Sequence, residues 1–164
     1  MIEKANPGEW RQLEGLIRDV RIALLTTSDR DGRFHTRPVQ TMEVDTNHAL
    51  WFFTDWTSPK AEELNHDIRL SLGYADPAKR VYAAISGTGR LIRDAGKAKE
   101  LWSLDQRAYY PDGPGDERLA LLQVRIERAE YWLAPGRVSY LIAALAAVAT
   151  GIPAGVIGEN HKLG

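Results

Sequence analysis

The sequence of 164 residues contains no cysteine. Disulfide bonds, thiolate nucleophiles and cysteine-ligated metal sites are therefore excluded. The absence agrees with a reducing compartment, and the N-terminal residues lack the apolar core of a signal peptide, so we expect a cytoplasmic protein. The four histidines lack the spacing of metal ligands, and we expect no metal site.

The sequence also lacks an excess of one charge and a long apolar run. Its 21 basic and 22 acidic residues leave a net charge of -1, which offers no long-range attraction to nucleic acid or to an anionic membrane. The longest apolar stretch, residues 138–150, is too short to span a bilayer and predicts a buried or partner-facing helix. We therefore expect neither a nucleic-acid partner nor a membrane partner.

What the sequence does contain is a series of β-hairpins with helices at the margins. Its 44% hydrophobic and 26% charged residues suit a single domain over residues 1–164. Strands are predicted over residues 21–27, 33–44, 49–54, 69–74, 81–92 and 119–132. Helices are predicted within residues 1–20, over 59–66 and 94–107, and within 136–164, where the tail from Gly151 is expected to be irregular. Consecutive hairpins are typical of a mainly β antiparallel barrel with peripheral helices, not of a doubly wound sheet.

Two glycines interrupt the strand predicted over residues 81–92. Gly87 and Gly89 flank Thr88, without the third glycine and the following helix that a dinucleotide-binding loop needs. Glycine inside a strand usually marks a bulge or a sharp bend. The pair therefore predicts a bulge or a corner of the barrel.

The segment from Thr54 to Lys60 has the features of an anion site. A strand ends at Thr54, a polar turn follows, and Ser58 and Pro59 begin a helix whose first turn contains Lys60. A helix start offers free N–H groups and a partial positive charge to an anion, whereas a lysine there opposes the helix dipole. A bound anion would remove this conflict, and Thr54 and Ser58 would add hydroxyl donors. The alternative is a simple capping pair with Lys60 in solvent.

A second candidate is Arg37, inside the strand predicted over residues 33–44. An arginine buried without a partner is costly, and the hairpin with the strand over residues 49–54 would bring Arg37 near Thr54. Arg37 could then bind a phosphate or the polar edge of a ring. Pro38 has no N–H group and predicts a barrel edge or a bulge. The alternative is an edge-strand arginine in solvent.

Six segments, in this order, carry a resemblance to a known family. They are residues 35–39 (HTRPV), 51–60 (WFFTDWTSPK), 101–102 (LW), 109–113 (YYPDG), 121–124 (LLQV) and 129–132 (AEYW). From about residue 10 to residue 135, the sequence resembles the general stress protein 26 branch of the pyridoxamine 5′-phosphate oxidase-like FMN-binding split barrels. The resemblance implies an antiparallel split β-barrel, a homodimer, and one flavin mononucleotide (FMN) at each dimer interface.

The resemblance also implies which residues would contact the FMN. Ser58 and Lys60 match the phosphate holders, Arg37 matches a residue that lines the flavin and its ribityl chain, and Trp132 matches a residue that comes from the partner subunit. No side chain is a convincing acid or base, so the catalytic residues stay unknown. The full set of matching positions is Arg37, Pro38, Val39, Phe53, Thr54, Asp55, Ser58, Lys60 and Trp132.

Three departures separate this sequence from the true oxidases. Pro59 stands where the oxidases have an arginine at the phosphate, and Met42 stands where they have a lysine for the phosphate of the substrate. Leu133 and the residues after it replace the Arg-Leu-His that follows the tryptophan in the oxidases. We therefore expect a different activity from pyridoxamine 5′-phosphate oxidation.

Two kinds of function agree with these residues. The first is a flavin-dependent oxidoreductase, in which the FMN passes electrons between small-molecule redox partners. The second is a non-catalytic module that sequesters or senses FMN during stress, which the absence of a substrate-phosphate lysine favours. Haem binding on the same barrel finds no convincing axial ligand, and His35 is the residue to consider for it.

Overall fold

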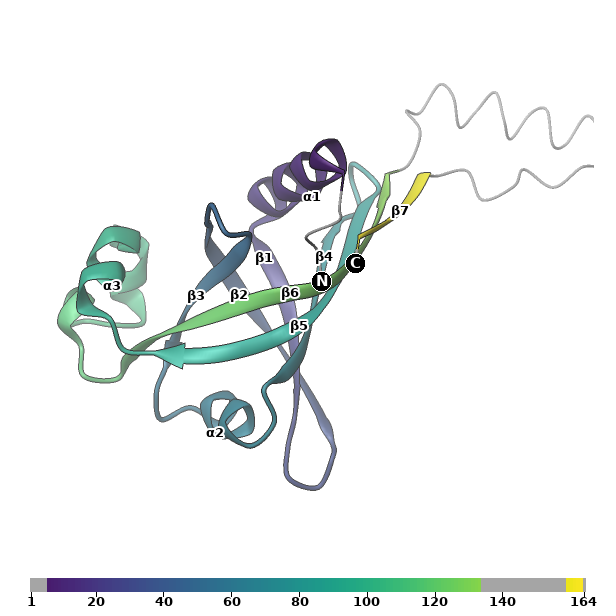
Figure 1. Cartoon of the computed structure of the whole chain (residues 1–164). Coiled ribbons are helices and arrows are strands. Elements are labelled where there is room, and N and C mark those ends of the chain that lie inside the picture. Colours follow the sequence, from purple (N-terminus) through teal and green to yellow (C-terminus); the bar gives the residue numbers. More distant parts are fainter. Residues whose placement is uncertain (1–5, 134–158, 164) are drawn as a thin grey trace, which may run out of the picture.

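A computed structural model describes residues 6–133 and 159–163 of the chain (Figure 1). The helices are α1 (Pro7–Val20), α2 (Pro59–His66) and α3 (Ala95–Leu101), with short 3-10 helices η2 (Leu104–Ala108) and η3 (Gly113–Gly115). The strands are β1 (Ile22–Ser28), β2 (Phe34–Val44), β3 (Ala49–Asp55), β4 (Arg69–Asp76), β5 (Val81–Ile92), β6 (Leu119–Leu133) and β7 (Glu159–Leu163). Among the described helices, none is long and apolar enough to cross a membrane.

The strands form an antiparallel barrel. Their order is β3-β2-β1-β4-β5-β6, and β3 also pairs with β6, so the sheet closes on itself. β7 adds to the outer edge of β6. The predicted mainly β barrel with peripheral helices is therefore confirmed.

The barrel is split between β2 and β3. These strands pair only from Thr41 to Val44, with a register shift between Thr41 and Glu43, whereas β2 pairs with β1 along its first half. Pro38 pairs with Leu24 of β1 and has no partner on β3, which confirms the predicted barrel edge. The first half of β2 and the end of β3 therefore separate at one end of the barrel.

Helices cover both ends of the barrel (Figure 1). α1 begins as predicted, with Pro7 in its first turn and the Asn6 side chain accepting a hydrogen bond from the Gly8 N–H. Its buried residues Leu13 and Ile17 join the interior of the barrel. α2 lies at the opposite end and contacts β1 and β5, with Leu64 in the same core.

Two expectations for the chain were wrong in detail. The helix predicted over residues 94–107 is two helices, α3 and η2, because the backbone is extended at Trp102 and Ser103. In the tail that was expected to be irregular, residues 159–163 form β7, which pairs with the end of β6 from Ala129 to Leu133. The helix predicted from residue 136 lies outside the described residues.

The glycine pair marks a bulge, as predicted. The pairing of β5 with β6 shifts between Ser86 and Gly87. A Cβ atom on Gly87 would overlap the backbone carbonyl of Arg125 on β6. Only glycine allows the two backbones to approach this closely.

We predict that Gly87→Ala lowers the free energy of unfolding by about 3 kcal/mol, because the backbone must shift to admit the methyl group. The control is Gly15→Ala on the exposed side of α1, where an added Cβ meets no atom within 4 Å. That variant should be neutral or stabilised by up to about 1 kcal/mol. Urea unfolding measures both, and equal stabilities would contradict the close approach.

Candidate functional site

The candidate site lies where β3 ends and α2 begins. The Asp55 carboxylate accepts hydrogen bonds from the Thr57 N–H (2.7 Å) and the Thr57 hydroxyl (2.6 Å). These bonds hold the pKa of Asp55 below its ordinary value. The Asp55 side chain therefore shapes the turn into α2 and has little freedom to bind a ligand.

α2 begins without a side-chain cap. The Ser58 hydroxyl donates to the backbone carbonyl of Asp55 (2.7 Å) instead of accepting from the helix. Pro59 occupies the first helical position, where its missing N–H group is not needed. The Ala61 and Glu62 N–H groups both donate to the Ser58 carbonyl. The Lys60 N–H is left for another partner, such as water or an anion.

Thr54 brings an unpaired hydroxyl to the same place. Its side chain is only 1% exposed, and its Oγ1 atom has no hydrogen-bond partner among the described residues. A buried hydroxyl without a partner is costly. A ligand oxygen would satisfy it.

Lys60 is the second unsatisfied group. It is half-buried, and no ion pair or hydrogen bond joins it to a described residue. Loss of water around the ammonium group lowers the pKa of Lys60, and the charge of Arg37 lowers it further, while Asp55 and Glu63 act in the opposite direction. A desolvated cation of this kind favours a bound anion.

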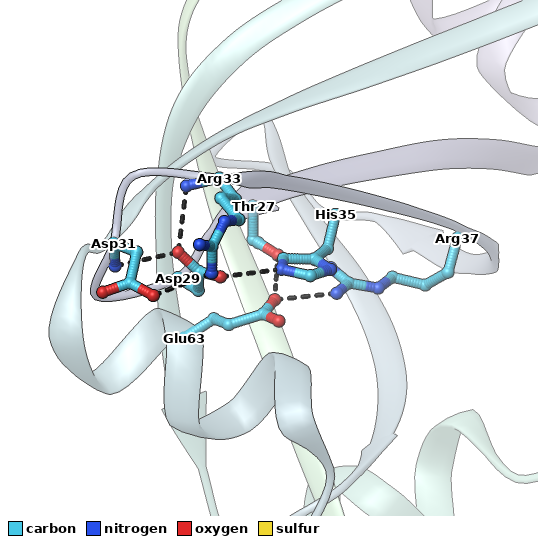
Figure 2. A network of polar contacts seen from close by, with 7 residues as sticks. All are labelled: Thr27, Asp29, Asp31, Arg33, His35, Arg37 and Glu63. Carbon is cyan, nitrogen blue, oxygen red and sulfur yellow. Dashed lines mark hydrogen bonds and ion pairs between the residues drawn. The ribbon is translucent and has the colours of Figure 1, made fainter.

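Arg37 is close enough for its charge to act on Lys60, but it already has a partner (Figure 2). Its Nη2 donates to Glu63 Oε2 at 2.7 Å, and its Nη1 donates to the Thr27 hydroxyl. Thr27 in turn donates to the same Glu63 oxygen. The side chains of Arg37 and Glu63 are 23% and 9% exposed, so the alternative of an edge-strand arginine in solvent is wrong.

The strand periodicity explains why these groups meet. Thr27, Arg37 and Thr54 continue the inward-facing rows of three neighbouring strands, which alternate between the inside and outside of the barrel. At the split between β2 and β3 these rows reach the end covered by α2. We call the set Arg37, Thr54, Ser58 and Lys60 the α2 cradle.

Sequence reasoning did not assign Glu63 to the site. Glu62 is exposed, and lies 3.8 Å from Arg30. Glu63 is buried because it lies on the side of α2 that carries Ala61 and Leu64. The available signal was Arg37 itself, since an arginine on an inward row requires a carboxylate partner.

The polar side chains of the hairpin between β1 and β2 contact one another (Figure 2). His35 Nε2 lies 3.0 Å from Asp29, and Arg33 lies 2.8 Å from Asp31. The hydrogen bond with His35 lowers the pKa of Asp29. No cluster of three metal-ligating side chains occurs within residues 6–133 and 159–163.

The other predicted residues do not join the cradle within one chain. Phe53 points outward and packs near Trp102 and Tyr110, with ring centres 5.9 and 6.4 Å apart. Val39 is buried in the core, and Pro38 is exposed on the outside of β2. The structure therefore gathers Arg37, Thr54, Asp55, Ser58 and Lys60, and separates the remaining positions from them.

Trp132 lies at the opposite end of the barrel. On β6, Ala120 pairs with Thr54, whereas Trp132 lies twelve positions further on and pairs with Tyr82 and Asn160. That interval is about 40 Å of extended strand. Leu133, the next residue, lines a hollow with Gln12 and Leu16 of α1. Trp132 cannot reach the cradle of its own chain.

Small and apolar residues cover the outside of the sheet between these two ends. Leu24 is 55% exposed, and its neighbours across the strands are Pro38 and Gly73, while Gly73 faces Ala84. Ile22 and Tyr82 are also exposed on this side. We call Ile22, Leu24, Pro38, Gly73, Tyr82 and Ala84 the outer face. Exposed apolar surface of this kind is typical of an interaction site.

Comparison with known proteins identifies the family. A sequence model of the family described as "pyridoxamine 5'-phosphate oxidase like" matches residues 8–153. The chain belongs to this family. Among curated proteins, none matches the sequence.

Solved structures of similar proteins share the fold. The general stress FMN/FAD binding protein from Xanthomonas citri is 26% identical, with a TM-score of 0.69 over 80% of this chain and 92% of its own. A protein related to general stress protein 26 from Clostridium acetobutylicum is 20% identical, with a TM-score of 0.68 over 78% and 90%. A pyridoxamine 5'-phosphate oxidase-related, FMN binding protein from Nostoc punctiforme is 18% identical, with a TM-score of 0.66 over 84% and 88%. The predicted family and split-barrel fold are confirmed.

We predict that Arg37→Met lowers the free energy of unfolding by about 2–3 kcal/mol, because the buried Glu63 carboxylate loses its partner. Adding Glu63→Gln should restore most of the loss. Arg30→Met, which removes the exposed partner of Glu62, should change stability by less than about 0.5 kcal/mol. Urea unfolding compares the three variants, and equal losses at Arg37 and Arg30 would contradict a buried ion pair.

Proposed function

We propose that this protein binds FMN, with the phosphate in the α2 cradle, and acts as a flavin-dependent oxidoreductase. One observation carries the proposal: Lys60, which is desolvated and has no ion pair, and the Thr54 hydroxyl, which has no hydrogen-bond partner, both belong to the segment where α2 begins without a side-chain cap. A phosphate monoester offers several acceptor oxygens and up to two negative charges. It would satisfy all three features at once.

The family supports FMN over other phosphate esters. The related proteins from Xanthomonas citri and Nostoc punctiforme are described as FMN/FAD binding and FMN binding. In this chain Lys60 would neutralise part of the phosphate charge, Thr54 would donate its hydroxyl, and the Lys60 N–H at the start of α2 would donate as well. Pro38, Val39 and Phe53 of the same chain and Trp132 of the partner subunit would contact the rest of the cofactor.

Bound FMN would supply the electron transfer, while the chain binds, orients and limits access. The ionisable groups near the cradle have other roles: Asp55 holds the turn, and Glu63 holds Arg37. Burial raises the pKa of Tyr110 to about 12, so its phenol stays protonated. We therefore propose that protons come from solvent or from the substrate, and we assign no catalytic residue.

The substrate is not pyridoxamine 5′-phosphate in this proposal. Met42, in place of the lysine of the oxidases, lies on β2 at the register shift beside β3 and offers no charge to a second phosphate. A small electron acceptor without a phosphate group fits better.

We further propose a homodimer that forms through the outer face. An exposed strip of Leu24, Ile22 and Tyr82 needs cover. A partner packed antiparallel to this strip would bring its Trp132 toward the cradle. This arrangement accounts for the distance between the cradle and Trp132 within one chain.

A non-catalytic module that sequesters or senses FMN is the second candidate. The engagement of Asp55 and Glu63 in structural contacts favours it, because neither carboxylate is free to exchange protons with a substrate. Turnover of NADH or NADPH with small acceptors would support the oxidoreductase. Tightly bound flavin that no donor reduces would support the module.

We propose one domain over residues 1–164, a cytoplasmic location, and no nucleic-acid or membrane partner. The even charge balance is the support for the last point.

We predict that Lys60→Gln weakens FMN binding about tenfold, because a charge-assisted hydrogen bond is worth about 1.5 kcal/mol or more. Riboflavin, which has no phosphate, should bind both proteins equally. The charge-matched control is Lys99→Gln on the exposed side of α3, which should leave both affinities unchanged. Fluorescence titration measures each, and an equal loss for riboflavin would place Lys60 away from the phosphate.

We predict that mixed dimers of Lys60→Gln and Trp132→Ala chains regain one intact site. If each site combines the cradle of one chain with Trp132 of the other, one site of the mixed dimer carries both substitutions and the second site carries neither. Dimers purified through two different affinity tags should therefore bind one FMN with the affinity of the unsubstituted protein. Loss of that affinity at both sites, or a monomer by light scattering, would contradict the shared site.

A further inference from the structure

We propose that Glu63 is a counter-charge that keeps the affinity of the α2 cradle for phosphate low, so that flavin exchanges readily. This inference rests on the proposed function and adds a regulatory residue to the same site. The buried Glu63 carboxylate, bound to Arg37 and Thr27, cancels the charge that Arg37 would otherwise offer (Figure 2).

The geometry ties up most of the donors of Arg37. Its Nη2 binds Glu63 and its Nη1 binds Thr27, which also donates to Glu63. A guanidinium has five N–H donors in a fixed fork. With both ends of the fork turned toward Glu63 and Thr27, the two-pronged grip that makes arginine a strong phosphate ligand is not free.

The charge balance of the cradle follows from these contacts. The charges of the Arg37 and Glu63 side chains sum to zero, and Pro59 carries no charge. Lys60 is left as the cation of the cradle without an ion pair among the described residues. A phosphate monoester carries about −1.5 to −2 near neutral pH, so the cradle neutralises only part of it.

Burial makes the Glu63 charge effective. Its side chain is 9% exposed, so little water screens it. The charge of Glu63 acts on the ammonium of Lys60, because it is among the groups that shift the pKa of that lysine. A phosphate held by Lys60 would therefore experience repulsion from Glu63.

Glu62 provides a natural comparison on the same helix. It neighbours Glu63 in sequence, but its side chain is 73% exposed and 3.8 Å from the equally exposed Arg30. Solvent screens charges of this kind strongly. Removing one charge at either position alters the net charge equally, so the two glutamates separate a local effect from a global one.

The test compares Glu63→Gln with Glu62→Gln by fluorescence titration and stopped-flow release of FMN. Glutamine keeps an oxygen that can accept from Arg37 and Thr27, so the Arg37 side chain stays in place while its charge is released. We expect Glu63→Gln to bind FMN about tenfold more tightly, with slower release, as one nearby desolvated charge predicts. Glu62→Gln should change the affinity less than about twofold. Unchanged or weaker binding in Glu63→Gln would overturn the proposal.

A double variant shows whether the released charge is that of Arg37. Arg37→Gln with Glu63→Gln replaces the ion pair by a neutral pair, and its affinity should return to within about twofold of the unsubstituted protein. A double variant that keeps the whole gain would contradict the counter-charge. Circular dichroism and thermal unfolding confirm that each variant is folded.

Two further measurements test the proposal without relying on the folding of Glu63→Gln alone. In the unsubstituted protein, FMN should bind no more than about a hundredfold more tightly than riboflavin, because one cation holds the phosphate. A thousandfold preference would contradict the counter-charge even if Glu63→Gln does not fold. Lys60→Gln serves as the separate check: if it leaves FMN binding unchanged, the proposed function fails, and if it weakens binding while Glu63→Gln does not tighten it, only the counter-charge fails.

Discussion

Closure of the sheet by β3 and β6, combined with the separation of β2 from β3 beyond Thr41, is the constraint on which the site depends. A closed barrel has no free edges except where strands part. At this opening the inward rows of β1, β2 and β3 reach the barrel end, and the chain turns at Asp55 to place α2 across it. A single topological feature thus brings polar residues from three strands under the start of one helix.

The inward position of Arg37 then determines the rest of the polar structure. A cation on an inward row requires a carboxylate, and α2 supplies Glu63 on the side that also carries Ala61 and Leu64. Thr27 completes the contact by accepting from Arg37 and donating to Glu63. Lys60, one turn earlier on the same helix, remains without such a partner. The contrast between these two cations, one with a carboxylate partner and one without, supports the proposed anion site in the cradle.

Local patterns predicted most of the fold. Each barrel strand was expected within two residues of its observed ends, because alternating apolar residues and turn residues are local signals. Gly87 predicted the bulge correctly, because glycine inside a strand usually marks a bulge or a close approach of two backbones. β7 was missed because residues 159–163 are mostly polar and gain their strand from the edge of β6. The break at Trp102 was missed because helical spacing continues across it.

The site was predictable only in part, for a similar reason. Thr54, Ser58 and Lys60 lie within seven residues, so their proximity follows from one turn. Arg37 required the hairpin to be placed correctly. Glu63 looks like its exposed neighbour Glu62 in sequence, and only the packing of α2 against the barrel separates them. Trp132 shows the opposite case, because its position far along β6 from the cradle emerges only from the register of the strands.

In the proposed site, the two ends of the cofactor would be held in different ways. One end would lie in the cradle of one chain, and the other would contact Trp132 at the far end of the partner's barrel. The phosphate end would be held by charge, which Glu63 reduces, and the ring end by contacts that exist only when two chains meet. Because the cradle would bind the phosphate only weakly, the contacts of the flavin ring with the partner chain would be needed to retain the cofactor. Pro59 fits this division: it favours the helix start that α2 needs, yet adds neither an N–H donor nor a charge. Cofactor retention in this protein would then depend on assembly as much as on the affinity of the cradle.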